Sequence, residues 1–161
     1  MAYAHHPSER DTRPYSSMVR VATDRIEAVR AASDIGLYVA FSRVIKPLAG
    51  EVPPERCIAT FGMVANPAMT HRQSDDHWRD THGPLALEMH RAMCDYTQLS
   101  VVETLHGQPL DGIAMCAFAT REDLSTRFFN DDDAKAAIIA DVATFADPSA
   151  SPPRVVLRQT V

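Results

Sequence analysis

The spacing of apolar residues near the start of the chain changes from a helical to a strand-like period. From Met18, apolar residues recur every three or four positions with charged residues between them, which predicts a helix that ends near Gly36. The run from Ile35 to Ile45 is rich in β-branched and aromatic residues, which is typical of a largely buried strand. We expect residues 18–46 to extend the edge of a sheet or to cover one mouth of a cavity.

The rest of the chain alternates strand-like and helix-like periods. The predicted elements are, in chain order, a strand over 57–65, helices over 70–82 and 85–94, strands over 97–105 and 113–118, helices over 120–129 and 134–145, and a strand over 155–161. This order is the split βαβ arrangement of a ferredoxin-like βαββαβ fold of the α+β class, in which helices cover one face of an antiparallel sheet. The other face needs a cover of its own, because its apolar positions would otherwise face water.

Local signals set the helix boundaries before the second core strand. Thr70 followed by Gln73 is a capping-box pattern, in which the two side chains satisfy backbone donors at a helix start. Pro84 disfavours helical geometry at the residue before it and suits the first turn of a new helix. The sequence therefore predicts a bend at Gly83-Pro84.

Length and composition fit a single globular domain. The chain has 161 residues, of which 45% are hydrophobic and 23% charged. Residues 1–16 are polar, contain prolines and show no hydrophobic period, which predicts a flexible N-terminal arm. The domain then spans 17–161, with a helix-strand extension over 17–50 and the ferredoxin-like core over 54–161.

Charge and hydropathy argue against several classes of partner. The net charge is −5, and the basic residues are spread without a run that could follow a phosphate backbone, so nucleic acid is not expected as a partner. No stretch has the length and apolarity of a membrane span or of a secretory signal, which predicts no membrane partner and a cytoplasmic location. Cys57, Cys94 and Cys116 are widely spaced and are interpreted as reduced, apolar residues.

Three motifs in the second half of the chain point to a family. They are His77-Trp78-Arg79-Asp80-Thr81-His82-Gly83-Pro84-Leu85, Tyr96-Thr97-Gln98 at the start of the second core strand, and Asp111-Gly112 at the start of the third. On these motifs the segment Cys57–Val161 resembles the EthD family of ferredoxin-like, dimeric α+β barrel proteins. The resemblance implies a homodimer in which the uncovered sheet faces pack together and close a barrel that takes small organic ligands.

The resemblance also implies a functional class. Members of the family are linked to oxidative or degradative metabolism of small organic compounds, and some resembling proteins oxidise or rearrange polyketide-like aromatics without a metal or organic cofactor. This chain has Ser74 where the family often has an aromatic residue, Leu99-Ser100 where it often has an Asn-His-like pair, and Met115 where it often has a glutamate. These departures make the expected pocket more apolar.

His82 is the leading candidate for a catalytic group. It precedes a Gly-Pro pair that can project its imidazole, and an ordinary histidine pKa of about 6.5 suits proton transfer near neutral pH. The structural alternative is that His82 caps the preceding helix at its negative end. His77 lies about 140° away round an α-helix, so the pair lacks the i, i+4 spacing of a shared metal site.

Further candidates line the expected pocket. Trp78 falls on nearly the same face as His82 and is expected to pack in the core and to form one wall. The Tyr96 hydroxyl can donate to a carbonyl or an enolate, or its ring can simply wedge helix against sheet. The other predicted substrate-binding residues are Phe61, Met63, Gln98, Met115 and Phe118. For the apolar ones, solid core or subunit interface is the alternative.

These features lead to two functional hypotheses from different classes. The first is a homodimeric enzyme that oxidises, isomerises or cyclises a small hydrophobic aromatic or carbonyl-bearing metabolite, with His82 as general base and His77 or Tyr96 stabilising the enolate. No phosphate loop or nucleophile motif stands out, so no bound cofactor and no metal are expected. The second is a non-catalytic dimeric carrier or scaffold that uses the same cavity, and haem handling through one axial histidine is a third possibility.

Overall fold

The computed structural model describes residues 1–5, 15 and 17–160. Its strands are β1 (Ala2–His5), β2 (Ser17–Val19), β3 (Gly36–Lys46), β4 (Cys57–Met63), β5 (Met93–Gly107), β6 (Gly112–Phe118) and β7 (Val155–Thr160). Its helices are the 3-10 turn η1 (Thr23–Arg25), α1 (Ile26–Arg30), α2 (His71–His77), the π-helix η2 (Trp78–His82), α3 (Gly83–Met89), α4 (Arg121–Thr126) and α5 (Asp132–Phe145).

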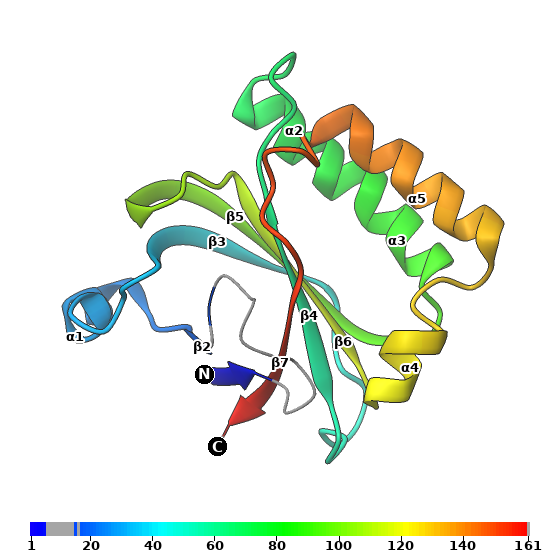
Figure 1. Ribbon diagram of the computed structural model, residues 1–161, viewed down its shortest axis with the longest axis horizontal. Helices are drawn as coiled ribbons and strands as arrows, with labels where there is room; N and C mark the ends of the chain where they lie inside the picture. Colours follow the sequence, from blue (N-terminus) through cyan, green and yellow to red (C-terminus); the bar gives the residue numbers. More distant parts are fainter. Residues whose placement is uncertain (6–14, 16, 161) are drawn as a thin grey trace.

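Within these described ranges, the strands form one seven-stranded antiparallel sheet that curls into a half-barrel (Figure 1). The strand order is β2-β1-β7-β4-β6-β5-β3. The central order β7-β4-β6-β5 joins two split βαβ units, as in a ferredoxin-like fold. Helices α2, α3 and α5 lie side by side on the outer face of the curl (Figure 1). The predicted α+β fold class is therefore confirmed.

The N-terminal extension differs from its prediction in its first half. The expected helix from Met18 to Gly36 is wrong: Ser17–Val19 is a strand, and the helical part is only η1 and α1. Neither helix buries any residue. A longer helix would need an apolar face packed on the core, and this segment has no such contact. Strand β3 pairs with β5 at the sheet edge, which confirms the edge extension.

The predicted flexible arm is wrong for its first residues. Ala2–His5 forms β1, which pairs with β7 on one side and β2 on the other. Tyr3 of this strand is buried in the core, and this burial anchors a segment whose sequence shows no strand-like period. Residues 6–14 and 16, which complete the predicted arm, lie outside the described residues.

The helical run after β4 begins as expected but continues through the predicted bend. Thr70 and Gln73 form the capping box. Gly83 is helical (φ −54°, ψ −56°), and its N–H bonds the Trp78 carbonyl five residues back. The expected break at Pro84 is therefore absent, and a wide π-turn stands in its place. In that turn the backbone bonds span five residues and not four, so the regular α-helical bonding stops before the proline ring.

Other helix and strand boundaries shift by a few residues. The third predicted helix ends at Met89 instead of Cys94, because β5 already begins at Met93. Thr120 caps α4 as predicted, but that helix stops at Thr126. Asp131 caps α5 by accepting a hydrogen bond from the Ala134 N–H, so the acidic run starts this helix.

Each face of the sheet carries its own apolar core. The face under the helices packs Cys57, Ala59, Tyr96, Cys116 and Phe118 with α3, α4 and α5. The inner face of the curl packs Ile58, Leu99, Met115, Ala117, Val155 and Leu157. Tyr3, Tyr15 and Met18 from the N-terminal extension join this second core. One chain thus covers much of the sheet face that the sequence assigned to a twin subunit.

A side-chain contact brings the two edges of the curled sheet together. Arg20 follows edge strand β2, and its Nη2 donates to Oγ of Ser42 on the opposite edge strand β3 at 2.8 Å. The same guanidinium lies 3.9 Å from Sδ of Met115 on the inner face. A side chain of the same chain therefore bridges the two edges of the half-barrel. Val44 lies two residues after Ser42 on β3, so its side chain points to the same inner face. It is 63% exposed at this edge of the sheet.

Candidate functional site

Two histidines of the HWRDTHGPL segment share one carboxylate. His77 Nε2 lies 2.8 Å from Asp141 Oδ1, and His82 Nδ1 lies 2.7 Å from Asp141 Oδ2. An ionised carboxylate only accepts hydrogen bonds, so both imidazoles donate to it. For His82 this fixes the proton on Nδ1 and leaves the lone pair on Nε2. The result is a neutral imidazole oriented by a carboxylate, with one basic nitrogen available.

The π-turn is the reason that both imidazoles reach the same carboxylate. Residues five apart in an α-helix differ by about 140° in direction, which led the sequence analysis to place His77 and His82 on different faces. The i→i+5 bond between Gly83 and Trp78 adds one residue to that turn. His82 therefore comes to lie over His77, and both side chains face α5. His82 Nδ1 bonds Asp141 on α5 and not a carbonyl of its own helix, which differs from the predicted capping role.

Asp141 is a functional candidate that the sequence analysis missed. It lies on α5, 59 residues after His82, and its side chain is 12% exposed. The one available signal was its position as the only charged residue between Lys135 and Phe145 in an apolar helix. Thr144 Oγ1 donates to the Asp141 carbonyl at 2.7 Å and lies 3.2 Å from His77 Nε2. These contacts fix the helix turn that carries the carboxylate.

Aromatic packing holds the two imidazoles. The Phe145 ring stacks on His77 with centroids 5.2 Å apart and lies against His82 at 5.1 Å. His82 is 7% exposed. Burial lowers the pKa of His82 below 6.5, although the hydrogen bond and charge of Asp141 partly oppose this. His82 is consequently neutral at pH 7, as a general base must be.

We expect acid to destabilise the fold through His82 and His90. Burial also lowers the pKa of His90, whose Nδ1 lies 2.5 Å from the Phe128 carbonyl. Below pH 6.5 the unfolded chain binds protons that the folded chain does not, so the free energy of unfolding falls by up to about 1.4 kcal/mol per pH unit for each histidine. Above pH 6.5 both states are neutral and the contribution disappears.

Urea unfolding between about pH 7 and pH 5.5 measures this dependence. The His90→Gln variant should lose roughly half of the pH slope. Equal slopes for the wild type and the variant would show that His90 does not carry the effect.

The three family-like motifs meet at Trp78. Trp78 Nε1 donates to Tyr96 Oη at 3.1 Å, and Gln98 Nε2 donates to the Trp78 carbonyl at 2.9 Å. A methyl group at Gly112 would lie 2.5 Å from Trp78 Cζ3, so only glycine leaves room for the indole. The segments His77–Leu85, Tyr96–Gln98 and Asp111–Gly112 are thus parts of one packing unit.

This packing unit is closed around Tyr96. Tyr96 is 1% exposed and its hydroxyl accepts from both Trp78 and Gln98, while burial raises its pKa far above 10. Trp78 is 2% exposed. These positions favour the packing interpretation of both residues, with the Tyr96 ring between helix and sheet. The structure does not bring Tyr96 Oη to the His82–Asp141 pair by any hydrogen bond among the described residues.

The extension adds a cation to the same unit. Arg43 of β3 forms a bidentate ion pair with Asp75 of α2, and its guanidinium carbon lies 5.8 Å from the Trp78 ring centroid. Burial tends to raise the pKa of Asp75, but the bonds from Arg43 and Ser100 outweigh it and hold that pKa below its usual value. Arg43 and Asp75 are 32 residues apart, and no sequence pattern links them, so this ion pair could not be predicted.

The remaining predicted pocket residues fall into three different environments. Phe61 and Phe118 pack on Phe128, with ring centroids 5.9 and 5.5 Å apart, and His90 packs on the same ring. Met63 packs with Trp78 and Phe145. Met115 lies on the inner face of the curl, and its role in substrate binding stays a prediction.

No metal centre is evident in the part of the chain that the structure describes. There, no group of three or more His, Cys, Asp or Glu side chains is arranged to hold an ion. None of the helices in the described ranges has the length and apolarity to cross a membrane.

Fold and site together define the class of protein. An antiparallel ferredoxin-like sheet carries helices on one face, and the histidine-rich helix is joined to α5 through a shared carboxylate. The family model of the EthD domain matches residues 66–149, just over half of the chain, so the chain belongs to the EthD family. No curated protein matches the chain. Membership of the family indicates a small-molecule-binding or enzyme-like domain.

Proposed function

We propose that this protein is a small-molecule enzyme in which His82 removes a proton from a hydrophobic aromatic or carbonyl-bearing substrate. The single observation that supports it is the hydrogen bond of 2.7 Å between His82 Nδ1 and Asp141 Oδ2. A carboxylate that holds one imidazole nitrogen as a donor orients the ring and raises the basicity of the other nitrogen. The lowered pKa of His82 keeps that nitrogen unprotonated at pH 7.

The first step is the transfer of an acidic C–H or phenolic proton to His82 Nε2. The carboxylate of Asp141 then stabilises the imidazolium. His77 is bonded to the same carboxylate and holds it in place, so it is assigned a positioning role. Tyr96 is left out of the mechanism, because its hydroxyl is buried between Trp78 and Gln98.

Oxidation is the reaction proposed after proton removal. The substrate carbanion gives its electrons to dioxygen, which forms the new C–O bond. For a methylene carbon the overall change is CH₂ plus O₂ to C=O plus H₂O, with the proton on His82 returned to the departing oxygen. Isomerisation or cyclisation begins with the same deprotonation and consumes no oxygen.

Turnover of anthrone-like and lactone substrates under air and under argon tests the proposal. We expect product formation in air, with oxygen consumption equal to product, and loss of turnover under argon. Undiminished turnover under argon would replace oxidation by isomerisation or cyclisation. Tight binding of the panel without any product would contradict an enzyme.

The last outcome would select the second candidate, a non-catalytic ligand-binding protein. It is favoured by Ser100, which bonds Asp75 and leaves no free polar group there, and by Met115, which lies on the inner face. The homodimer stays a prediction in either case. Because one chain already buries much of its inner sheet face, a second copy would have to dock on the exposed edge around Val44.

A further inference from the structure

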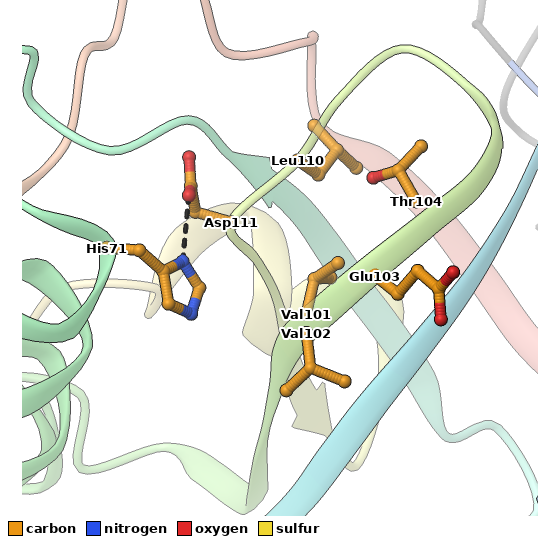
Figure 2. Close-up of a pocket in the computed structure, with 7 residues that line it drawn as sticks. All are labelled: His71, Val101, Val102, Glu103, Thr104, Leu110 and Asp111. Atoms are coloured by element: carbon orange, nitrogen blue, oxygen red, sulfur yellow. Dashed lines mark hydrogen bonds and ion pairs between the residues drawn. The ribbon is translucent and has the colours of Figure 1, made fainter.

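A second histidine–aspartate pair opens onto a pocket at the surface. The pocket has a volume of about 190 Å³ and lies between the start of α2, the far end of β5 and the loop before β6 (Figure 2). Val101, Val102 and Leu110 give it apolar walls, and His71 and Asp111 form its polar end. None of these residues belongs to the His77–Asp141–His82 group, so this is a separate feature.

Asp111 is held rigidly by the backbone around it. Its Oδ2 accepts from the Ala65 N–H at 2.7 Å, its own N–H donates to the Met63 carbonyl at 2.8 Å, and its carbonyl accepts from the Val101 N–H at 3.0 Å. The carboxylate is therefore fixed before any ligand arrives. Its second oxygen, Oδ1, lies 2.8 Å from His71 Nδ1.

This bond decides what His71 can offer to a ligand. The ionised carboxylate accepts only, so Nδ1 is the donor, and in the neutral imidazole Nε2 carries the lone pair. Figure 2 shows the Nε2 edge of the ring turned away from Asp111. The His71 side chain is 43% exposed, so a solute can reach it. The pocket thus presents one oriented hydrogen-bond acceptor beside apolar walls.

Charge and apolar surface narrow the class of ligand. The carboxylates of Asp111 and Glu103 both line the pocket, which disfavours an anion. Val102 is 51% exposed and Phe41, on the neighbouring strand, is 69% exposed. Phe41 pairs with Ser100, two residues before Val102, so exposed apolar side chains occur on both strands near the pocket.

We propose that this pocket binds a neutral, hydroxyl-bearing apolar molecule such as a phenol. The hydroxyl donates to His71 Nε2, and the ring lies on Val101, Val102 and Leu110. The site does not depend on proton removal by His82, because it uses none of the same residues. It gives the chain a second place for small aromatic molecules, at the opposite end of the α2–η2 helical run from His82.

Titration of phenol into the isotope-labelled full chain, followed by NMR, tests the proposal. We expect saturable shifts of the His71 imidazole and of the methyl groups of Val101, Val102 and Leu110. Toluene, which has the ring without the donor, should bind about fivefold more weakly, the equivalent of one neutral hydrogen bond. Benzoate should cause no shift. Saturable benzoate binding, or shifts confined to other residues, would overturn the proposal.

A matched pair of variants distinguishes the hydrogen bond to His71 from non-specific hydrophobic binding. His71→Phe keeps a ring and removes the acceptor, and it should weaken phenol binding about fivefold while leaving toluene binding unchanged. His106→Phe changes an exposed histidine of β5, the strand that carries Val101 and Val102, and does not touch the pocket, so both affinities should stay as in the wild type. Equal phenol affinity for His71→Phe and the wild type would rule out His71 as the acceptor.

Discussion

We expect His82→Gln to lower kcat/KM by about 10²–10⁴-fold, the usual contribution of a positioned general base. Glutamine can still donate to Asp141 through its amide, so the contact between η2 and α5 is kept. It cannot accept a proton at neutral pH, so only the chemical step is removed. The measurement is steady-state turnover of the best substrate in air, with urea unfolding to show that the variant is folded.

The control for this variant is His106→Gln, the same substitution at an exposed histidine away from the His82–Asp141 pair. It should keep wild-type turnover. The wild-type enzyme should also lose kcat/KM in acid, on a limb whose midpoint lies below pH 6.5, because burial lowers the pKa of His82. If His82→Gln retained turnover within about threefold of the wild type, His82 would not be the base.

The second large effect is expected for Asp141→Asn. An amide can accept from one imidazole but presents an NH₂ group to the other, so one histidine must change its tautomer or lose its bond. The loss of two charge-assisted bonds at a side chain that is 12% exposed should cost about 2–4 kcal/mol in the free energy of unfolding. Turnover should fall by about 10²-fold, since His82 is no longer held with Nε2 as the base.

The pH profile distinguishes positioning from simple loss of stability. The hydrogen bond and charge of Asp141 raise the pKa of His82, while burial lowers it. Without the carboxylate the acid limb of kcat/KM should therefore move to lower pH. A purely structural role would reduce the amount of folded protein and leave the limb in place. Asp133→Asn, the same substitution in the exposed first turn of α5, should change neither quantity appreciably.

The strands of the core could be predicted from sequence because their signals are local. The runs beginning at Cys57, Thr97, Ile113 and Val155 are rich in apolar and β-branched residues, and each of these four residues lies in a strand. The helix expected from Met18 failed because apolar spacing alone does not make a helix that has nothing to pack on. Met18 instead lies on strand β2 and packs against the inner core.

The candidate site could be predicted only in part. The His77–Leu85 motif located the helical segment, but the partner of both histidines lies on a helix far along the chain. No local pattern relates Asp141 to His82. The angular argument that separated His77 from His82 assumed an α-helix, and one π-turn is enough to invalidate it. Likewise, alternation along β6 could not decide which face of the sheet Met115 would occupy.

The wide turn over Trp78–His82 brings the imidazoles of His77 and His82 to the same side of the helical run. A substitution between His77 and His82 that keeps this turn leaves both rings directed at Asp141. An α-helical turn with the same five-residue spacing would rotate His82 by about 140° from His77, and the pair would lose the shared contact. The wide turn and the five-residue spacing of the two histidines are thus matched, and the shared contact with Asp141 depends on both.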